Sequence, residues 1–222
     1  MLEHIDEFDD IIKSLNESDA LKHIVLIGSW TLHVYQYKYP EIESDLLTTN
    51  DVDFSIHRAF DTKKTSSPSI RASLNNLGYE SFPKGGPPEG QIFKPDITHG
   101  EKELAVEFLC APGRHIKDPY LVKGLSVVAT PVKHQDVLLD NIEKINYKEM
   151  VVNVPKPEFY AAHKISISQK RTDPDKEEKD LLCASKVIKV IGQEKVLEIG
   201  NDGKASFNRN FKTGWNKLQK LI

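Results

Sequence analysis

The sequence contains only two cysteines, Cys110 and Cys183, among its 222 residues. Two thiols are too few for a disulfide framework or a cysteine-based zinc site, which favours a reducing compartment such as the cytoplasm. No apolar run exceeds four residues, far below the roughly 18 that a membrane-spanning helix requires. Five of the first ten residues are acidic, unlike the basic start of a secretory signal. We therefore expect a cytoplasmic protein that does not enter the membrane.

The composition is that of a folded protein with an uneven distribution of charge. Hydrophobic residues make up 39% of the chain and charged residues 28%, which excludes global disorder. Residues 1–154 carry 16 Lys and Arg against 24 Asp and Glu, whereas residues 155–222 carry 14 against 9. This pattern suggests a cleft in which a metal ion contacts one wall and phosphates contact the other. Uneven surface decoration is the alternative.

Hydrophobic periodicity predicts an α/β (α+β) protein with a boundary at Pro155-Lys156-Pro157. Residues 1–154 form the expected mixed α/β domain, and residues 155–222 the expected helical domain, in which Asp173 caps a helix with Pro174 at its first position. The expected strands are His23–Ile27, Asp51–His57, Gln91–Lys94, Glu103–Cys110, Leu125–Thr130 and Glu149–Val154. The expected helices of the first domain begin around Ile5 and span Trp30–Tyr39, Pro68–Leu77 and Gln135–Ile145, and residues 84–90 are expected to form a loop.

Two carboxylates share one face of the strand predicted at 51–57. Val52, Phe54 and Ile56 alternate with Asp51 and Asp53, so both carboxylates lie on the polar side, about 7 Å apart along the chain. A divalent cation with a preference for oxygen ligands, such as Mg²⁺, would relieve their mutual repulsion. A solvent-facing pair of aspartates is the alternative for this motif by itself.

A third carboxylate, Glu107, lies in the apolar segment Leu104–Cys110. An isolated buried carboxylate is costly, so Glu107 requires a cation, a lysine or an arginine nearby. An exposed or salt-bridged structural glutamate is the alternative.

The dipeptide Gly28-Ser29 joins a predicted strand to a predicted helix. Such a junction offers unpaired backbone N–H groups and a hydroxyl, which suit phosphate oxygens, and glycine permits a close approach. Taken alone, the dipeptide is equally consistent with an ordinary helix cap.

Together these motifs resemble the nucleotidyltransferase fold of the DNA polymerase β superfamily, and in particular the bacterial minimal nucleotidyltransferases related to AbiE-type toxins. The resemblance rests on Ile27–Trp30, Thr49–Phe54 and Val106–Leu109, and extends to Pro157–Lys164, Arg171 and Lys179-Asp180. It implies a mixed β-sheet with flanking helices and a C-terminal helical domain. It also implies transfer of a nucleoside monophosphate from an NTP to RNA, a protein or a small molecule.

The same resemblance implies a role for each site residue. Asp51 and Asp53 would bind two Mg²⁺ ions, while Glu107 would complete the metal site or help to deprotonate the attacking hydroxyl. Gly28 and Ser29 would hold the nucleotide phosphates, and Lys164 would contact a phosphate. For Lys164, the alternative to a phosphate contact is an ordinary solvent-exposed helix residue. This alternative is stronger for Lys179 and for Arg171.

The sequence departs from the family pattern in two places. Ser29 and Asp51 are 22 positions apart, which predicts an inserted loop at residues 41–50. The third carboxylate is usually Asp, whereas here it is Glu107, whose longer side chain makes it a less certain general base.

Two other functions use the same residues. One is a catalytically inactive binding module that acts through a cognate antitoxin-like protein. The other is metal-dependent phosphoester hydrolysis. In the tail, Phe207, Phe211 and Trp215 recur among basic residues, which predicts a helix with a buried aromatic stripe; stacking on single-stranded nucleic acid is the less favoured reading.

Overall fold

The computed structural model describes six stretches of the chain: residues 4–44, 49–57, 70–79, 104–113, 119–202 and 205–221. The predicted loop at 84–90 and the predicted strand at 91–94 lie outside the described residues, as do residues 45–48 of the predicted insertion.

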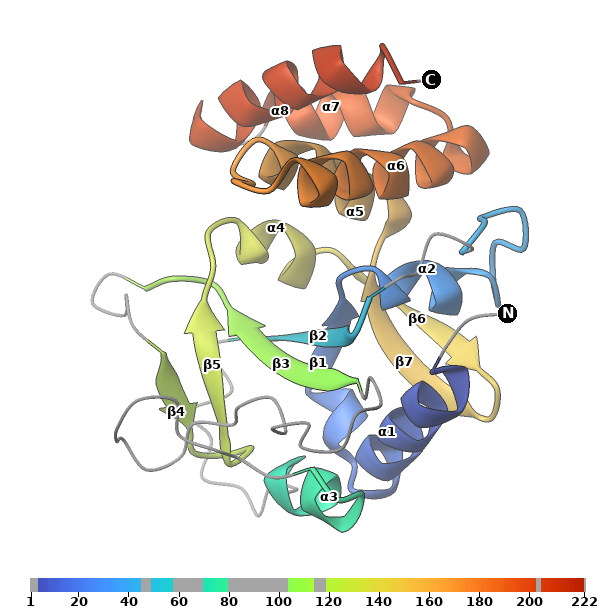
Figure 1. Ribbon diagram of the computed structural model, residues 1–222, viewed down its shortest axis with the longest axis vertical. Helices are drawn as coiled ribbons and strands as arrows, with labels where there is room; N and C mark the ends of the chain where they lie inside the picture. The colour runs from blue at the N-terminus through green and yellow to red at the C-terminus, as the bar shows by residue number, and fades with distance from the viewer. Residues whose placement is uncertain are drawn as a thin grey trace.

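A mixed β-sheet occupies the centre of the first part of the chain, with strand order β1-β2-β3-β5-β4 (Figure 1). Strands β2 and β3, and strands β3 and β5, run parallel, whereas the outer pairs β1–β2 and β4–β5 are antiparallel. This mixed sheet with flanking helices confirms the predicted fold class. The strands are β1 (Ile24–Ile27), β2 (Asp51–Ile56), β3 (Ala105–Cys110), β4 (Tyr120–Val122) and β5 (Val127–Pro131).

The two faces of the sheet differ in character. On one face, Val52, Phe54 and Phe108 are buried in the main core, which also receives α1 (Ile5–Glu17) and α3 (Ile70–Asn76). The opposite face carries the odd-numbered side chains of β2 and β3. There a smaller apolar cluster joins β1 to α4: Val25, Ile27, Leu138 and Leu139.

The predicted helix at Gln135–Ile145 is wrong in its second half. Helix α4 (Gln135–Leu139) is short, and β6 (Ile142–Tyr147) follows, paired antiparallel with β7 (Met150–Pro155). Ile145 and Tyr147 are buried, whereas the residues between and around them are exposed, so the segment has the two-residue period of a strand. Pairing with β7 gives this alternation its buried face. Two smaller differences are that β4 was not predicted and that α2 (Trp30–Tyr35) ends before Tyr39.

Four helices follow β7 and gather at one end of the molecule (Figure 1). Helix α5 packs against the other three, and Asp173 caps α6 as predicted, because its carboxylate accepts a hydrogen bond of 3.0 Å from the Asp175 N–H. No described helix is long and apolar enough to cross a bilayer. The division into two domains remains a prediction. The helices are α5 (Pro157–Ser168), α6 (Pro174–Ile191), α7 (Glu194–Asp202) and α8 (Ala205–Leu218).

The aromatic residues of the tail belong to the core. Phe207, Phe211 and Trp215 are buried on one side of α8, which confirms the predicted stripe and leaves no aromatic face for base stacking on this helix. Helix α8 also continues through Gly214, where a side chain would place a Cβ 2.3 Å from the Ile165 carbonyl oxygen. Glycine therefore allows α8 to approach α5 closely.

Candidate active site

The three acidic residues singled out in the sequence meet on one face of the sheet. Asp51 and Asp53 point to the same side of β2, opposite the buried Val52 and Phe54. In the parallel register between β2 and β3, Asp53 lies directly opposite Glu107. Paired residues of neighbouring strands project from the same side, so Glu107 belongs to this group of carboxylates.

The charges around the three carboxylates have their clearest effect on the pKa of Asp53. Burial raises the pKa of the Asp53 carboxyl from 3.8 to about 7, and the charges of Glu107 and Asp51 act in the same direction. Lys164 and Arg171 lie near enough to lower this pKa, but do not compensate fully. Asp53 therefore has more negative charge around it than the neighbouring cations balance.

The Gly28-Ser29 turn lies against this carboxylate. Gly28 adopts a φ of 74°, and a Cβ at this position would stand 2.3 Å from Oδ2 of Asp53. Only glycine fits both the backbone conformation and the space. Ser29 is buried and precedes α2, and its hydroxyl forms no capping hydrogen bond with that helix. The turn and the carboxylate group are thus parts of one site.

Lys164 faces this site from α5, but it is not a free, solvated lysine. Its side chain is buried, and its Nζ donates a hydrogen bond of 2.6 Å to Oδ1 of Asp180 on α6. Burial by itself would lower the pKa of Lys164, but Asp180 outweighs that effect, and the pKa is raised above its ordinary value. Lys164 is therefore a fixed positive charge.

Two further cationic residues of the helical part, Arg171 and Lys179, lie near Lys164 and with it form one positively charged wall of the site. Arg171 Nε donates to Oδ2 of Asp180 at 2.7 Å, so one carboxylate holds both Lys164 and Arg171. Lys179 is half-buried; burial lowers its pKa, and Lys164 lowers it further against the opposing effects of Asp180 and Asp51. Lys164 of α5, Lys179 of α6 and Arg171 between these helices thus lie near the carboxylates of β2 and β3.

Two contributors, Asp180 and Tyr160, belong to segments that carry the resemblance, but neither was assigned a role from the sequence. Asp180 lies on the buried side of α6, beside Leu181 and Ala184, and an acid on an otherwise apolar stripe is the signal that would have revealed it. Tyr160 lies at the other end of the site, where its hydroxyl donates a hydrogen bond of 3.0 Å to the Gly28 carbonyl. Its ring also faces Lys164 Nζ at 5.8 Å. No sequence motif indicated that Tyr160 would contact Gly28 or Lys164.

The carboxylates are not arranged as a ready metal-binding group. Among the described residues, no three side chains of His, Cys, Asp or Glu are close enough together to hold a metal ion. The chemistry of the donors nevertheless fits Mg²⁺, because Asp51, Asp53 and Glu107 offer only carboxylate oxygens, and the charges of Asp51 and Glu107 raise the pKa of Asp53. Metal binding here would require these side chains to draw together.

Two histidines, His163 and His57, lie near the site in the sequence, one buried and the other exposed. His163 precedes Lys164 and is buried; burial and the charge of Lys164 lower its pKa to about 3, so it stays neutral. His57 lies at the far end of β2, exposed, with its Nε2 3.7 Å from Asp140.

Comparison with known proteins agrees with this geometry. A family model described as "Nucleotidyltransferase" matches residues 6–204, which include the sheet, the carboxylates and the helices α5 to α7. The chain belongs to the nucleotidyltransferase family. A search among curated protein sequences found no significant match.

The chain is also similar to a solved structure. It is similar to the crystal structure of an antigenic nucleotidyltransferase-like protein from Paracoccidioides brasiliensis, with a TM-score of 0.53 and 17% sequence identity. The match covers 98% of this chain and 91% of the other. At this identity the likeness concerns the fold, which the two proteins share across both the sheet and the helical part.

Proposed function

We propose that this nucleotidyltransferase transfers a nucleoside monophosphate from an NTP to an acceptor hydroxyl on RNA, a protein or a small molecule, with Mg²⁺ as cofactor. One observation carries the proposal. Asp53 and Glu107 are paired across two strands, with Asp51 on the same face, the Gly28 turn against them and a wall of cations opposite. Acidic and basic groups that face each other in this way suit a metal-bound triphosphate.

The residues that would bind one or two Mg²⁺ ions are Asp51, Asp53 and Glu107. When bound, Mg²⁺ supplies neutralisation of charge on the α-phosphate and on the departing pyrophosphate. The raised pKa of Asp53 supports this assignment, because a neighbouring cation would return the carboxylate to its ionised form at neutral pH.

The other side chains position the reactants. The Gly28-Ser29 turn brings backbone groups and the Ser29 hydroxyl to the phosphates, and Lys164 presents a positive charge that Asp180 keeps in place. The acceptor oxygen forms a bond to the α-phosphorus while the bond from that phosphorus to the bridging oxygen breaks and pyrophosphate leaves. In this proposal, Glu107 receives the acceptor's proton. Positioning and electrostatics supply most of the rate enhancement.

The test is pyrophosphate release from each of the four NTPs with Mg²⁺, together with transfer of an α-labelled nucleotide to RNA, to protein or to the chain itself. Asp53→Asn is expected to reduce both signals at least about a hundredfold, since it removes a charged metal ligand. Asp10→Asn, an exposed carboxylate on α1, is the matched control and retains activity. Activity that survives Asp53→Asn would overturn the proposal.

A second candidate is a nucleotidyltransferase-fold binding module without turnover. The spread arrangement of the carboxylates favours it, as does the presence of Glu107 where the family usually has Asp. It predicts NTP binding without pyrophosphate release, together with tight binding to a cognate protein. Release of inorganic phosphate or cleaved nucleic acid, without nucleotide transfer, would instead indicate phosphoester hydrolysis.

Three finer assignments belong to the same proposal. The sequence resemblance at Lys179-Asp180 and Arg171 supports the AbiE-type subgroup, and with it a cognate antitoxin-like partner. The cysteines, which are both free and buried, support a cytoplasmic location. The base of the NTP would be determined by the transfer assay.

A further inference from the structure

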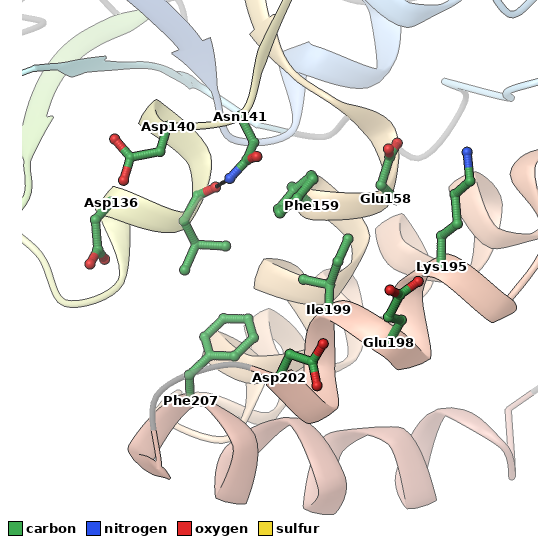
Figure 2. A pocket seen from close by; sticks show the side chains of 11 residues that line it. Asp136, Asp140, Asn141, Glu158, Phe159, Lys195, Glu198, Ile199, Asp202 and Phe207 are labelled. Carbon is green, nitrogen blue, oxygen red and sulfur yellow. Dashed lines mark hydrogen bonds between the residues drawn. The ribbon is translucent and has the colours of Figure 1, made fainter.

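A second concave site lies between α4, α5, α7 and the start of α8, and none of Asp51, Asp53 and Glu107 lines it (Figure 2). It has a volume of about 510 Å³. Phe159 belongs to α5, as does Lys164, but five positions separate them, which places them about 140° apart around the helix. This groove, which we call the α4–α7 groove, therefore opens on a different side of α5 from the nucleotide site.

The floor of the α4–α7 groove is apolar. Phe159, Ile199 and Phe207 come from three different helices and point toward one space (Figure 2), and Val137 of α4 also lines it. The ring of Phe207 is held in place by His134, against which it packs edge-on with ring centroids 5.4 Å apart. A supported aromatic and aliphatic floor of this kind accepts an apolar side chain of a partner.

The rim of the groove is acidic. Among the described residues that line it, Lys195 is the one cation, against the carboxylates Asp136, Asp140, Glu158, Glu198 and Asp202. Asp136 and Glu158 lie in the first turns of α4 and α5, where a carboxylate stabilises its own helix. Asp140 lies 3.7 Å from His57 Nε2, whereas Glu198 and Asp202 lie outside the first turn of α7.

Glu198 and Asp202 are exposed carboxylates on α7, and the helix dipole disfavours the second of them. Asp202 is the last residue of α7, at the negative end of its dipole, and Glu198 lies one turn before it; the last turn of this helix contains no basic residue. Within the described chain, neither forms a salt bridge, and both are exposed. Asp202 is repelled by the terminal carbonyl groups of α7 and by Glu198 four positions before it, and a bound cation would relieve both repulsions.

We propose that the α4–α7 groove binds a basic amphipathic peptide segment of a partner protein. An apolar side chain of this segment would pack on Phe159, Ile199 and Phe207, while its Lys or Arg side chains would meet Asp140, Glu198 and Asp202. The apolar floor and the one-sided charge of the rim together favour such a segment over an acidic peptide or a nucleic acid. The proposal does not depend on the nucleotidyl transfer reaction.

The test measures binding of a fluorescein-labelled helical peptide of Leu and Lys, about 14 residues long, to the full chain by fluorescence anisotropy. Two comparison peptides have Lys replaced by Glu, or Leu replaced by Gln. The groove variant is Glu198→Lys with Asp202→Lys. Its matched control is Glu17→Lys with Glu149→Lys, which changes the net charge equally at exposed positions outside the lining of the groove.

We expect the groove variant to weaken binding of the Leu/Lys peptide by about tenfold or more, and the control variant by less than about twofold. Both comparison peptides should bind the wild-type chain at least about tenfold more weakly. Equal weakening by the two variants would show non-specific attraction and overturn the proposal. Retained binding of the Gln-containing peptide, with displacement by spermine, would overturn it in favour of a site for small polycations. Circular dichroism establishes that each variant is folded.

Discussion

The hydroxyl of Tyr160 donates a hydrogen bond of 3.0 Å to the carbonyl oxygen of Gly28. This contact joins helix α5 of the second part of the chain to the glycine turn of the first. Because the ring of Tyr160 also faces Lys164, one buried side chain contacts both the turn proposed to hold phosphates and the lysine opposite it.

Tyr160→Phe is expected to raise the KM for NTP about fivefold or more with a smaller change in kcat, because the turn loses its fixed position while the packing remains. Stability should fall by about 1 kcal/mol from the unpaired carbonyl. Tyr35→Phe is the matched control, since its hydroxyl donates to the Pro155 carbonyl at 2.6 Å and its ring packs edge-on against Tyr160. The control should lose similar stability and keep its KM. A raised KM in both variants would contradict a specific role for Tyr160.

Gly28→Ala should destabilise the protein by about 3 kcal/mol and abolish activity, because the new Cβ would clash with the Asp53 carboxylate. Gly78→Ala separates this clash from backbone strain. Gly78 has a similar φ of 85°, but a Cβ there meets no atom within 4 Å, so the expected cost is about 1 kcal/mol. Urea unfolding of both variants measures the difference. Equal costs would mean that the approach of Gly28 to Asp53 is unimportant for stability.

Asp53→Asn should stabilise the metal-free protein at pH 8 while it abolishes transfer. The folded-state pKa of Asp53 is raised to about 7 from 3.8, so the folded protein is most stable with Asp53 protonated and loses stability as pH rises through this interval. A shift of this size corresponds to at most about 4 kcal/mol, and partial exposure of Asp53 reduces it to about 1–3 kcal/mol.

Thermal unfolding between pH 5 and pH 8 measures this effect. The advantage of Asp53→Asn over the wild-type chain should shrink as pH falls, and Mg²⁺ should raise the Tm of the wild-type chain at pH 8 but not that of the variant. A variant that is less stable than the wild-type chain at pH 8 without metal would contradict the assignment.

The ion pair between Lys164 and Asp180 should be strongly coupled. Asp180→Asn leaves Lys164 buried without its compensating charge and should cost about 3–5 kcal/mol. The double variant Lys164→Met with Asp180→Asn should cost less than the sum of the single changes, with a coupling energy of about 2 kcal/mol. The exposed pair Lys22–Asp19 at 2.5 Å is the control, and its coupling should be below about 1 kcal/mol. Additive costs at Lys164 and Asp180 would show that the two residues act separately.

Local patterns in the sequence were sufficient where the physical cause is itself local. Alternation along β2 placed Asp51 and Asp53 on one face, because successive side chains of a strand point to opposite sides. Asp173 and Pro174 predicted the start of α6, since capping and a fixed proline φ act within one turn. The same reasoning failed at 142–147, where pairing with the following strand selected β6 over a helix.

The sequence by itself thus determined the mixed α/β class, the acidic face of β2 and the candidate residues of the site. Only the tertiary structure decided that Glu107 lies opposite Asp53, that Asp180 holds Lys164 and Arg171, and that helices α4, α5 and α7 enclose an acidic groove. These relationships join residues that are distant in the chain, and they depend on strand register and helix packing. Periodicity specifies which face of an element is buried, but not the partner against which it is buried.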